Sequence, residues 1–403
     1  MSFGRGHVDS SGPRNARLAI IGEAPGPTEI DRGFPMAGWT GDFVNRALGG
    51  QEQRNVTFVT NASRCLPPDY EKDSKIFARI EHYRPALEAD LASLDRCQTL
   101  LCCGKEALQA ITGSPHISEF HGSVLNRREV EAVRQGAGGN QLSYMSRVLP
   151  PSLRTVVFSF HPAFTTRGLP QFRPMIATAI RRAKWWAHMD QVVPRWGEES
   201  FNLIPTPDEV KEFLDENPTA PLVVDVETPW GEPQTILLCG IACNGKTLVF
   251  PWTTPYRIIM RHVLESNRPI VGHNFFYDMA AFYAYGIRCA DPIWDTINAG
   301  AILWPPTKSK KDQEAAGQKR KKTVSARWLS LAMCTMRVKS GYYFWKQTDY
   351  SGNPMFEMPA LYKASYPWCP DEFHERLYCG LDCLHTEMLW YAVEELMKQK
   401  GML

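Results

Sequence analysis

Residues Val223–Thr228 read VVDVET, and this short run sets the fold and chemistry expected of the C-terminal half of the chain. Its valines are typical of a strand, and the longer segment PLVVDVET (221–228) has the length of one. Because side chains alternate along a strand, Asp225 and Glu227 project from the same face. Two carboxylates held so close repel each other unless a cation lies between them, and hard divalent ions prefer oxygen ligands. The run therefore predicts a metal site.

Two further acidic residues follow in segments of helical character. Asp278 lies in the apolar run IVGHNFFYDMAAF (270–282). Near the C-terminus, LYCGLDCLHT places Tyr378 and Asp382 four residues apart, on one helical face. A single aspartate in such a place is more often a cap or a solvated side chain. The four acids indicate a site only together, in this order and each in its expected element.

Four apolar runs in the N-terminal half alternate with helical segments, which indicates an α/β domain with a mostly parallel sheet. The ligand site of such a sheet lies beyond the carboxyl ends of its strands, where Glu23, Asn61 and His161 all fall. The predicted strands of this half are RLAIIGEA (17–24), NVTFVTNAS (55–63), QTLLCCG (98–104) and TVVFSFHP (155–162). In the C-terminal half, a meander of strands followed by helices indicates a mixed sheet.

The length of 403 residues suits two domains of about 200 residues each. The segment QVVPRWGEESFNLIPTPDEV has three prolines and little apolar periodicity, so it marks a linker. We expect a first domain over residues 1–190, a linker over 191–204 and a second domain over 205–403.

Composition indicates a globular protein of the cytoplasm without a membrane partner. No apolar run approaches the roughly 20 residues that span a bilayer, and the N-terminus has no signal-peptide core. The eleven cysteines are scattered and odd in number, which fits reduced thiols. The net charge of +2 is nearly neutral, but the run KSKKDQEAAGQKRKK (308–322) is strongly basic. It is either a solvated insertion or an arm that contacts phosphates, and it can be both.

Three segments of the C-terminal half, VVDVET, GHNFFYDMAAF and YCGLDCLHT, resemble the motifs of the proofreading exonuclease domain of family A DNA polymerases. That domain is a 3′–5′ exonuclease of the tyrosine subclass of DEDD enzymes, with a ribonuclease-H-like mixed sheet. The resemblance runs from about residue 205 to the C-terminus and includes DTINAGAILW (295–304) between the second and third motifs. Ribonuclease D-like enzymes share the same acids, so the choice between DNA and RNA stays open.

The resemblance implies a site for two ions of Mg²⁺ or Mn²⁺. Asp225, Glu227 and Asp382 would hold one ion, and Asp278 with Asp225 would hold the other. Tyr378 would orient the attacking water. Asn274, in the second motif, would make a structural or substrate contact.

The N-terminal half resembles the family 4 uracil-DNA glycosylases over roughly residues 14–187. The resemblance lies in IIGEAPGPTEIDRGFPMAGWTGDFVNRAL, VTNASRCLPP and FSFHPAFTTRG, in this order. It implies that Glu23 positions the water that attacks the sugar, that Asn61 contacts the edge of a flipped pyrimidine and that His161 stabilises the leaving base. The turn residues Gly22, Ala24 and Pro25 would approach the substrate through their backbone.

Two departures from that family change the expectation. The family carries a four-cysteine iron–sulfur cluster, but only Cys65 matches one of its ligands and Tyr83 stands where another is expected. We therefore expect no iron–sulfur cluster. The aromatic residue that stacks on uracil in the family corresponds to Met36, and loss of that face costs about 1–3 kcal/mol of stacking. The pocket would then accept another base or only hold DNA.

The combined interpretation is a DNA-processing enzyme of replication or repair, in which a glycosylase-like domain precedes a metal-dependent 3′–5′ exonuclease. The alternative is a proofreading subunit of a separate DNA polymerase, with a non-catalytic DNA- or partner-binding N-terminal domain. The expected partners are single-stranded DNA or DNA 3′ ends and, under the alternative, that polymerase. A compact viral replication module would suit either arrangement and would place the protein in the host cytoplasm. The sequence ends at Leu403, after the third motif, where the polymerases continue into their polymerase domain.

Overall fold

The computed structural model describes eight segments of the chain, which form two compact units. The first unit contains the described residues up to 189, and the second contains those from 201 onward. The predicted fold class is confirmed: an α/β chain with a parallel-sheet domain followed by a domain with a mixed sheet. The basic run 308–322 lies outside the described residues. These residues are 4–67, 73–135, 137–165, 172–189, 201–229, 232–304, 331–338 and 370–403.

The segment expected as a linker, 191–204, includes a short strand at its C-terminal end. Phe201–Asn202 form the strand β6, which pairs in parallel with β9 (Lys246–Pro251). Two residues are too few to show the alternation of a strand in the sequence. Their backbone groups pair with β9, which lies more than 40 residues later in the chain. Across the described segments, no helix is both long enough and apolar enough to cross a membrane.

The first unit is built on a five-stranded sheet in the order β2-β1-β3-β5-β4. Its central strands are parallel, and β4, which the sequence did not predict, joins the edge in the antiparallel direction. β1, β3 and β5 are buried along their whole length, as expected of parallel strands covered on both faces. The strands are β1 (Leu18–Gly22), β2 (Phe58–Asn61), β3 (Thr99–Cys103), β4 (Val124–Asn126) and β5 (Thr155–Ser159).

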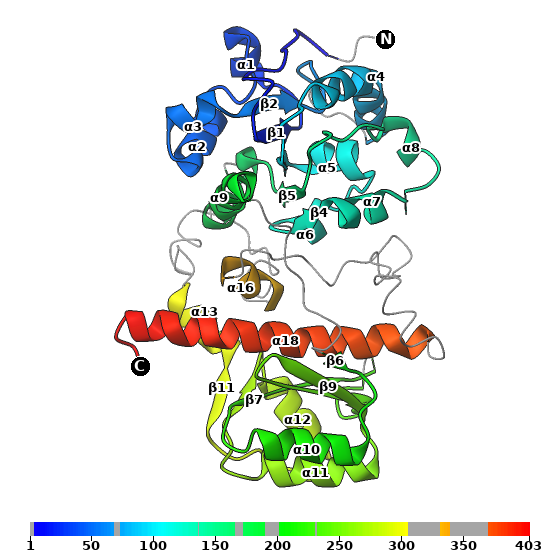
Figure 1. The fold of residues 1–403 in the computed structure, drawn as a ribbon, viewed down its shortest axis with the longest axis vertical. Helices are drawn as coiled ribbons and strands as arrows, with labels where there is room; N and C mark the ends of the chain where they lie inside the picture. The colour runs from blue at the N-terminus through cyan, green and yellow to red at the C-terminus, as the bar shows by residue number, and fades with distance from the viewer. Residues whose placement is uncertain are drawn as a thin grey trace, which may run out of the picture. The chain divides into compact units, whose positions relative to one another are not determined.

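Helices cover both faces of this sheet (Figure 1). One face packs on α2 and α9, whose Val44, Leu48 and Ile180 join Ile20 and Val157 in a single core. The other face carries α5, with α4, α7 and α8 beside it. The helices are α1 (Pro27–Arg32), α2 (Trp39–Leu48), α3 (Gln51–Asn55), α4 (Asp73–Ala92), α5 (Lys105–Thr112), α6 (Ile117–Phe120), α7 (Arg127–Gln135), α8 (Gln141–Tyr144) and α9 (Arg173–His188), with a 3₁₀ turn, η1 (Pro162–Thr165).

The second unit is built on a six-stranded mixed sheet in the order β11-β10-β7-β8-β9-β6. β11, β10 and β7 are parallel to one another, whereas β8 runs antiparallel to both of its neighbours, β7 and β9. The remaining strands are β7 (Leu222–Glu227), β8 (Leu238–Cys243), β10 (Ile270–Gly272) and β11 (Ile293–Asp295). The helices are α10 (Pro207–Glu216), α11 (Thr254–Leu264), α12 (Phe276–Ala284), α13 (Thr296–Leu303), α16 (Leu331–Val338) and α18 (Pro370–Gln399).

Alternation along β7 separates the two faces of this sheet. Val224 and Val226 point into a core built with α10, α11 and α12. Val223, on the opposite face, packs with Cys383 and Trp390 of α18. Figure 1 shows α18 crossing this side of the sheet and α10 and α11 lying on the other. Asp225 and Glu227 share the face of Val223, so they point towards α18.

Two glycines allow α18 to approach the sheet closely. A Cβ on Gly240 of β8 would lie 2.6 Å from the Sγ of Cys383 and 2.7 Å from that of Cys379. A Cβ on Gly380 of α18 would lie 3.1 Å from the ring of Phe201. Since Gly240 pairs with Asp225 across β7 and β8, this close packing brings the third-motif helix against the strand of the first motif.

Candidate active sites

The acid cluster of the second unit centres on β7. The carboxylates of Asp225 and Glu227 and the thiol of Cys379 form a group whose ligand atoms all lie within 4.8 Å of one another. Both carboxylates are half-buried, and Cys379 is fully buried. The sequence predicted the two acids on one face of β7 but not the thiol. The position of Cys379, directly after Tyr378 in the third motif, could have indicated that the thiol lies near the site.

Asp278 reaches the same strand from α12. Its Oδ1 accepts a hydrogen bond of 3.0 Å from the main-chain N–H of Val226, the residue between Asp225 and Glu227. Burial raises the pKa of Asp278 to about 7. The hydrogen bond from Val226 opposes this shift, and the nearby charges of Asp295 and Asp382 add to it. A bound cation would favour the charged form instead.

Asp382 and Tyr378 come from α18, one helical turn apart. Asp382 is buried and Tyr378 is half-buried. The charge of Asp382 acts on Asp278, so these two acids are brought together. We expected Asp382 to share an ion with Asp225 and Glu227, and that role stays a prediction. The compact group on β7 has Cys379 as its third member.

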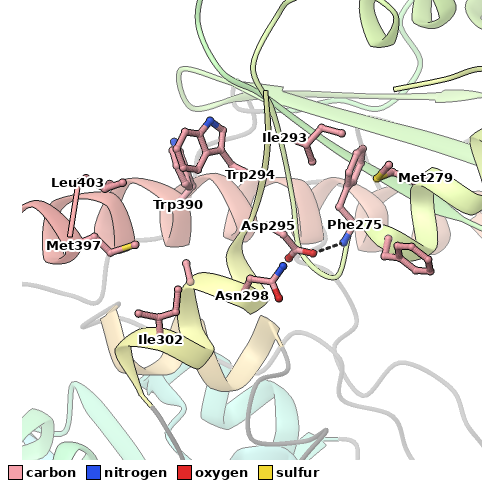
Figure 2. A pocket seen from close by; sticks show the side chains of 12 residues that line it. Phe275, Met279, Ile293, Trp294, Asp295, Asn298, Ile302, Trp390, Met397 and Leu403 are labelled. Carbon is pink, nitrogen blue, oxygen red and sulfur yellow. Dashed lines mark hydrogen bonds between the residues drawn. The ribbon is translucent and has the colours of Figure 1, made fainter. Parts of the chain in front are cut away.

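Asp295, which the sequence analysis did not single out, shapes the turn before α12. Asn274 has a φ of 62°, in the left-handed region. Its N–H donates to Oδ1 of Asp295 at 2.9 Å, and the N–H of Phe275 donates to Oδ2 at 3.0 Å. Figure 2 shows the bond between Phe275 and Asp295. Asp295 also caps α13 through the N–H of Ile297. It therefore positions the start of the helix that carries Asp278.

Glu23 lies directly after β1, at the carboxyl edge of the first sheet. Its Oε1 accepts a hydrogen bond of 2.7 Å from the N–H of Lys105, at the start of α5. Gly104, with a φ of 99°, makes this possible, since a Cβ there would lie 2.4 Å from the carboxylate. β1 pairs with both β2 and β3, so the topological switch point lies at this edge.

The side chains of Asn61 and Met36 both lie close to Gly22. Gly22 pairs with Asn61 across β1 and β2, and a Cβ on Gly22 would lie 2.3 Å from Oδ1 of Asn61 and 2.9 Å from Cε of Met36. The Asn61 side chain is buried, with 2% exposure, and its Nδ2 has no hydrogen-bond partner among the described residues. A buried amide donor of this kind needs a partner, and a ligand can supply one.

Met36 belongs to the core rather than to an open stacking face. It is 3% exposed and packs in the cluster that contains Ile20. Its φ of 55° is left-handed, and its N–H donates to the carboxylate of Glu29. Glu29 also accepts from the N–H of Gly26 at 2.6 Å. Burial raises the pKa of Glu29, and these backbone hydrogen bonds lower it. Glu29, which sequence reasoning missed, fixes the turn that follows Gly22, Ala24 and Pro25.

His161 follows β5 at the same edge of the first sheet. Its Nδ1 accepts a hydrogen bond of 3.3 Å from the N–H of Ala163, so a neutral ring carries its proton on Nε2. A second histidine, His121, accepts from the N–H of Phe160 at 3.1 Å. Burial lowers the pKa of His121 to about 3, with the charge of Arg182 adding to the effect, so this ring is neutral. The sequence analysis did not single out His121.

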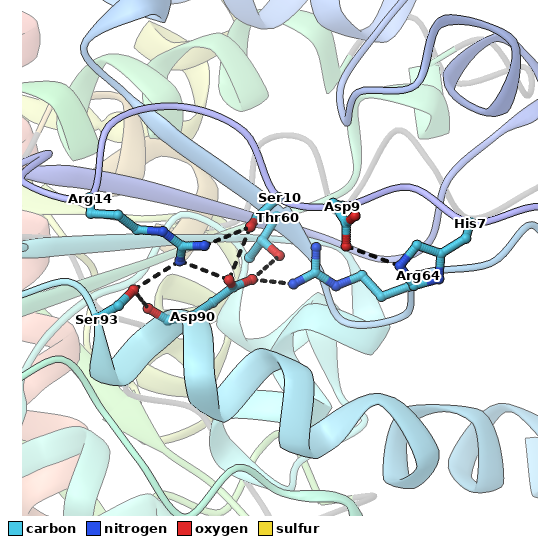
Figure 3. Close-up of polar contacts among 8 residues, drawn as sticks. All are labelled: His7, Asp9, Ser10, Arg14, Thr60, Arg64, Asp90 and Ser93. Atoms are coloured by element: carbon cyan, nitrogen blue, oxygen red, sulfur yellow. Dashed lines mark hydrogen bonds and ion pairs between the residues drawn. The ribbon is translucent and has the colours of Figure 1, made fainter.

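A buried ion-pair network anchors the segment after β2 (Figure 3). Asp90 of α4 pairs with Arg64 and with Arg14, the latter at 2.8 Å. It also accepts hydrogen bonds from Thr60 at 2.9 Å and Ser10 at 3.0 Å. Removing one partner of such a buried network typically costs 3–5 kcal/mol. The network holds β2 in place and thereby positions Asn61, which follows Thr60.

The residues around Cys65 do not fit an iron–sulfur cluster. Such a cluster needs about four cysteine thiolates. The group close to Cys65 is instead the phenol of Tyr83, whose pKa rises to about 12 through burial and its hydrogen bond with Cys65. Within the described ranges, no group of three or more potential metal ligands includes Cys65.

Similar solved structures include nuclease domains. The Aedes aegypti Nibbler EXO domain has 11% identity and a TM-score of 0.32, over 52% of this chain and 94% of that one. Brucella melitensis NrnC with bound Mg²⁺ has 12% identity and a TM-score of 0.27, over 47% of this chain and 79% of that one. Likeness at this level carries no argument about activity.

Relatives by sequence include type-4 uracil-DNA glycosylases. A type-4 uracil-DNA glycosylase of Pyrobaculum aerophilum is 35% identical over 63 residues, which are 15% of this chain and 32% of that protein. The chain thus spans about a third of the length of the first curated relatives it matches. Residues 10–183 match the family model described as the uracil DNA glycosylase superfamily, so this part of the chain is a domain similar to that superfamily.

Proposed function

We propose that the second unit is a metal-dependent 3′–5′ exonuclease. The observation that carries the proposal is the position of Asp278, whose carboxylate is held at Val226 between Asp225 and Glu227. Asp225 and Glu227 lie together on β7, Asp278 of α12 reaches the same strand, and the charge of Asp382 of α18 acts on Asp278. Such a concentration of like charge is costly without cations, and Mg²⁺ or Mn²⁺ prefers these ligands.

The chemistry expected of this site is phosphodiester hydrolysis. These carboxylates would hold Mg²⁺ or Mn²⁺, which would supply activation of a water and stabilisation of the charge on the attacking and leaving oxygens. Tyr378, one turn before Asp382, would orient that water. Asn274, held in a left-handed conformation by Asp295, would contact the substrate or fix the turn. The oxygen of water would bond to phosphorus as the bond from phosphorus to the 3′ oxygen of the preceding nucleotide breaks, that oxygen would take a proton, and the terminal nucleotide would depart with a 5′-phosphate.

A second activity, removal of a base, is favoured by Asn61 in the first unit. Its buried Nδ2 is a donor with no described partner, at the switch point of the sheet and near the end of β1 that leads to Glu23. Glu23, oriented by Lys105, would position a water that attacks the sugar as the N-glycosidic bond breaks. The Nε2–H of His161 would stabilise the electron pair that departs with the base. Met36 stands where the family has an aromatic residue and offers no stacking face, so removal of uracil would be weak.

The alternative keeps the exonuclease and makes the first unit a binding module for DNA or for a separate polymerase. The observation that favours it is again Met36, which fills core space rather than facing a ligand. The two proposals for the first unit, a glycosylase and a binding module, predict different products. Only a glycosylase leaves abasic sites, which alkali converts into strand breaks.

The test of the exonuclease uses 5′-labelled single-stranded DNA. We expect shortening from the 3′ end with Mg²⁺ or Mn²⁺ and none in excess chelator. Asp225→Ala with Glu227→Ala should abolish it. The matched control is Asp215→Ala with Glu216→Ala, which removes an exposed Asp–Glu pair from α10 and should leave the rate unchanged. Digestion by the first double variant at the rate of the control would overturn the proposal. The same nuclease-dead variant, given uracil-containing DNA and then alkali, tests the first unit.

A further inference from the structure

Cysteine is a common metal ligand, but the proposed two-ion mechanism does not use Cys379. Its thiol lies beside Asp225 and Glu227, where that mechanism would hold its ions. Its sulfur and the carboxylate oxygens of Asp225 and Glu227 all lie within 4.8 Å of one another. The three donors come from two elements distant in sequence, β7 and α18. Donors that converge in this way, with a thiol among them, resemble the ligand set of a thiophilic ion.

The thiol is held there by packing, together with that of Cys383. Cys379 and Cys383 lie one helical turn apart and sit above Gly240, where a Cβ would displace both sulfurs. A side chain on Gly240 would fill the space that these sulfurs occupy beside Asp225. The close approach of α18 to β8 therefore places soft ligands beside hard ones.

We propose that this site binds one thiophilic divalent ion, with Zn²⁺ as the physiological candidate, through Asp225, Glu227 and the thiolate of Cys379. On binding, the thiol loses its proton to solvent and the sulfur–metal bond forms, without any change of oxidation state. Mg²⁺ takes oxygen ligands and has little affinity for thiolate, so the thiol discriminates between the two kinds of ion. The fourth position of a tetrahedral Zn²⁺ would be open to water or to a substrate oxygen.

The functional consequence of Zn²⁺ binding rests on the proposed exonuclease activity. Zn²⁺ on Asp225 and Glu227 would occupy ligands that the magnesium pair requires, so the nuclease would be inhibited by Zn²⁺ at concentrations well below those of Mg²⁺. Replacing the thiol should remove this preference and leave the carboxylates available for Mg²⁺. The ion-binding step itself needs neither DNA nor activity.

The test is titration of the metal-free, full-length protein with Cd²⁺, followed by the ultraviolet charge-transfer absorption of a cadmium–thiolate bond. We expect saturation at one ion per chain. Cys379→Ser should abolish the band and weaken binding at least about tenfold, the lower bound for losing even a supporting residue of a metal site. Asp225→Asn, which leaves every thiol intact, should also weaken binding at least about tenfold. Cys289→Ser is the matched control, because this half-buried cysteine lies outside the group and should leave the titration unchanged.

The outcomes separate this inference from the proposed function. A band of unchanged strength and affinity in Cys379→Ser would overturn the inference, as would equal loss in Cys289→Ser. If Cys379→Ser does not fold, as judged by circular dichroism, Asp225→Asn decides, and unchanged Cd²⁺ affinity in that variant rejects the site. A protein that binds Cd²⁺ as expected but never digests DNA would instead refute the exonuclease and retain the metal site.

Discussion

The carboxylate of Asp278 accepts a hydrogen bond of 3.0 Å from the main-chain N–H of Val226, the residue between Asp225 and Glu227 in the sequence. The contact joins a helix to a strand 52 residues earlier in the chain. Burial raises the pKa of Asp278, and this hydrogen bond opposes the shift. Without a cation, Asp278 therefore keeps its proton to a higher pH than an ordinary aspartate does. A bound cation would favour its charged form.

The first prediction is a pH dependence of stability that belongs to Asp278. Its pKa of about 7 in the folded protein lies above the ordinary value of 3.8, so the folded state binds more protons than the unfolded state between these values. The free energy of unfolding should therefore fall as pH rises from about 4 to about 7 in metal-free protein. Asp278→Asn keeps an oxygen acceptor for Val226 without the titration, so the fall should be smaller in the variant.

The measurement is denaturant unfolding of both proteins at several pH values in chelator. Mg²⁺ at pH 8 should stabilise the wild type, because an ion favours the charged carboxylates, and should stabilise Asp278→Asn less. Parallel pH profiles of the two proteins would show that Asp278 does not titrate in this window.

The second prediction concerns Asp295 as a positioning residue. Asp295→Ala removes acceptors for the N–H groups of Asn274, Phe275 and Ile297, and losses of this kind cost about 1–3 kcal/mol. Because the turn before α12 should loosen, exonuclease turnover should fall with little change in KM. Asp215→Ala, an exposed acid on α10, is the control for stability and turnover. Full exonuclease activity of Asp295→Ala would show that the turn before α12 does not position the acids of the site.

The third prediction tests the pocket of the first unit without removing a polar group. Gly22→Ala would place a Cβ 2.3 Å from Oδ1 of Asn61, so the buried amide must move. Base-dependent binding of single-stranded DNA by nuclease-dead protein should weaken by about tenfold, the effect of roughly 1.4 kcal/mol. Gly138→Ala is the matched control, since a Cβ there meets nothing within 4 Å. Equal binding by the two variants would mean that Asn61 does not read a base.

The fourth prediction concerns iron. Tyr83, rather than a second thiol, is the partner found for Cys65, so purified protein should contain no stoichiometric iron and should lack the visible absorption of an iron–sulfur cluster. Metal analysis of protein purified without oxygen checks this. Iron retained at about four atoms per chain would mean that cysteines elsewhere in the chain complete a site around Cys65.

Local patterns in the sequence determined the elements and the order of the motifs. Period-two alternation placed Asp225 and Glu227 on one face of a strand, and helical spacing placed Tyr378 and Asp382 on one face of a helix. Strands that end in polar turns placed Glu23 and Asn61 at one edge of a parallel sheet, and in the structure their strands pair in parallel. These predictions succeeded because each depends on the backbone geometry of a few consecutive residues.

Only the tertiary structure decided which side chains meet. No local pattern joins Cys379 to the acids of β7, because their approach depends on Gly240 of β8, which has no side chain. The burial of Met36 depends on the core that surrounds it, and the strand β6 exists only because β9 lies beside it. Contacts between residues far apart in the chain are fixed by packing of whole elements, which no local period records.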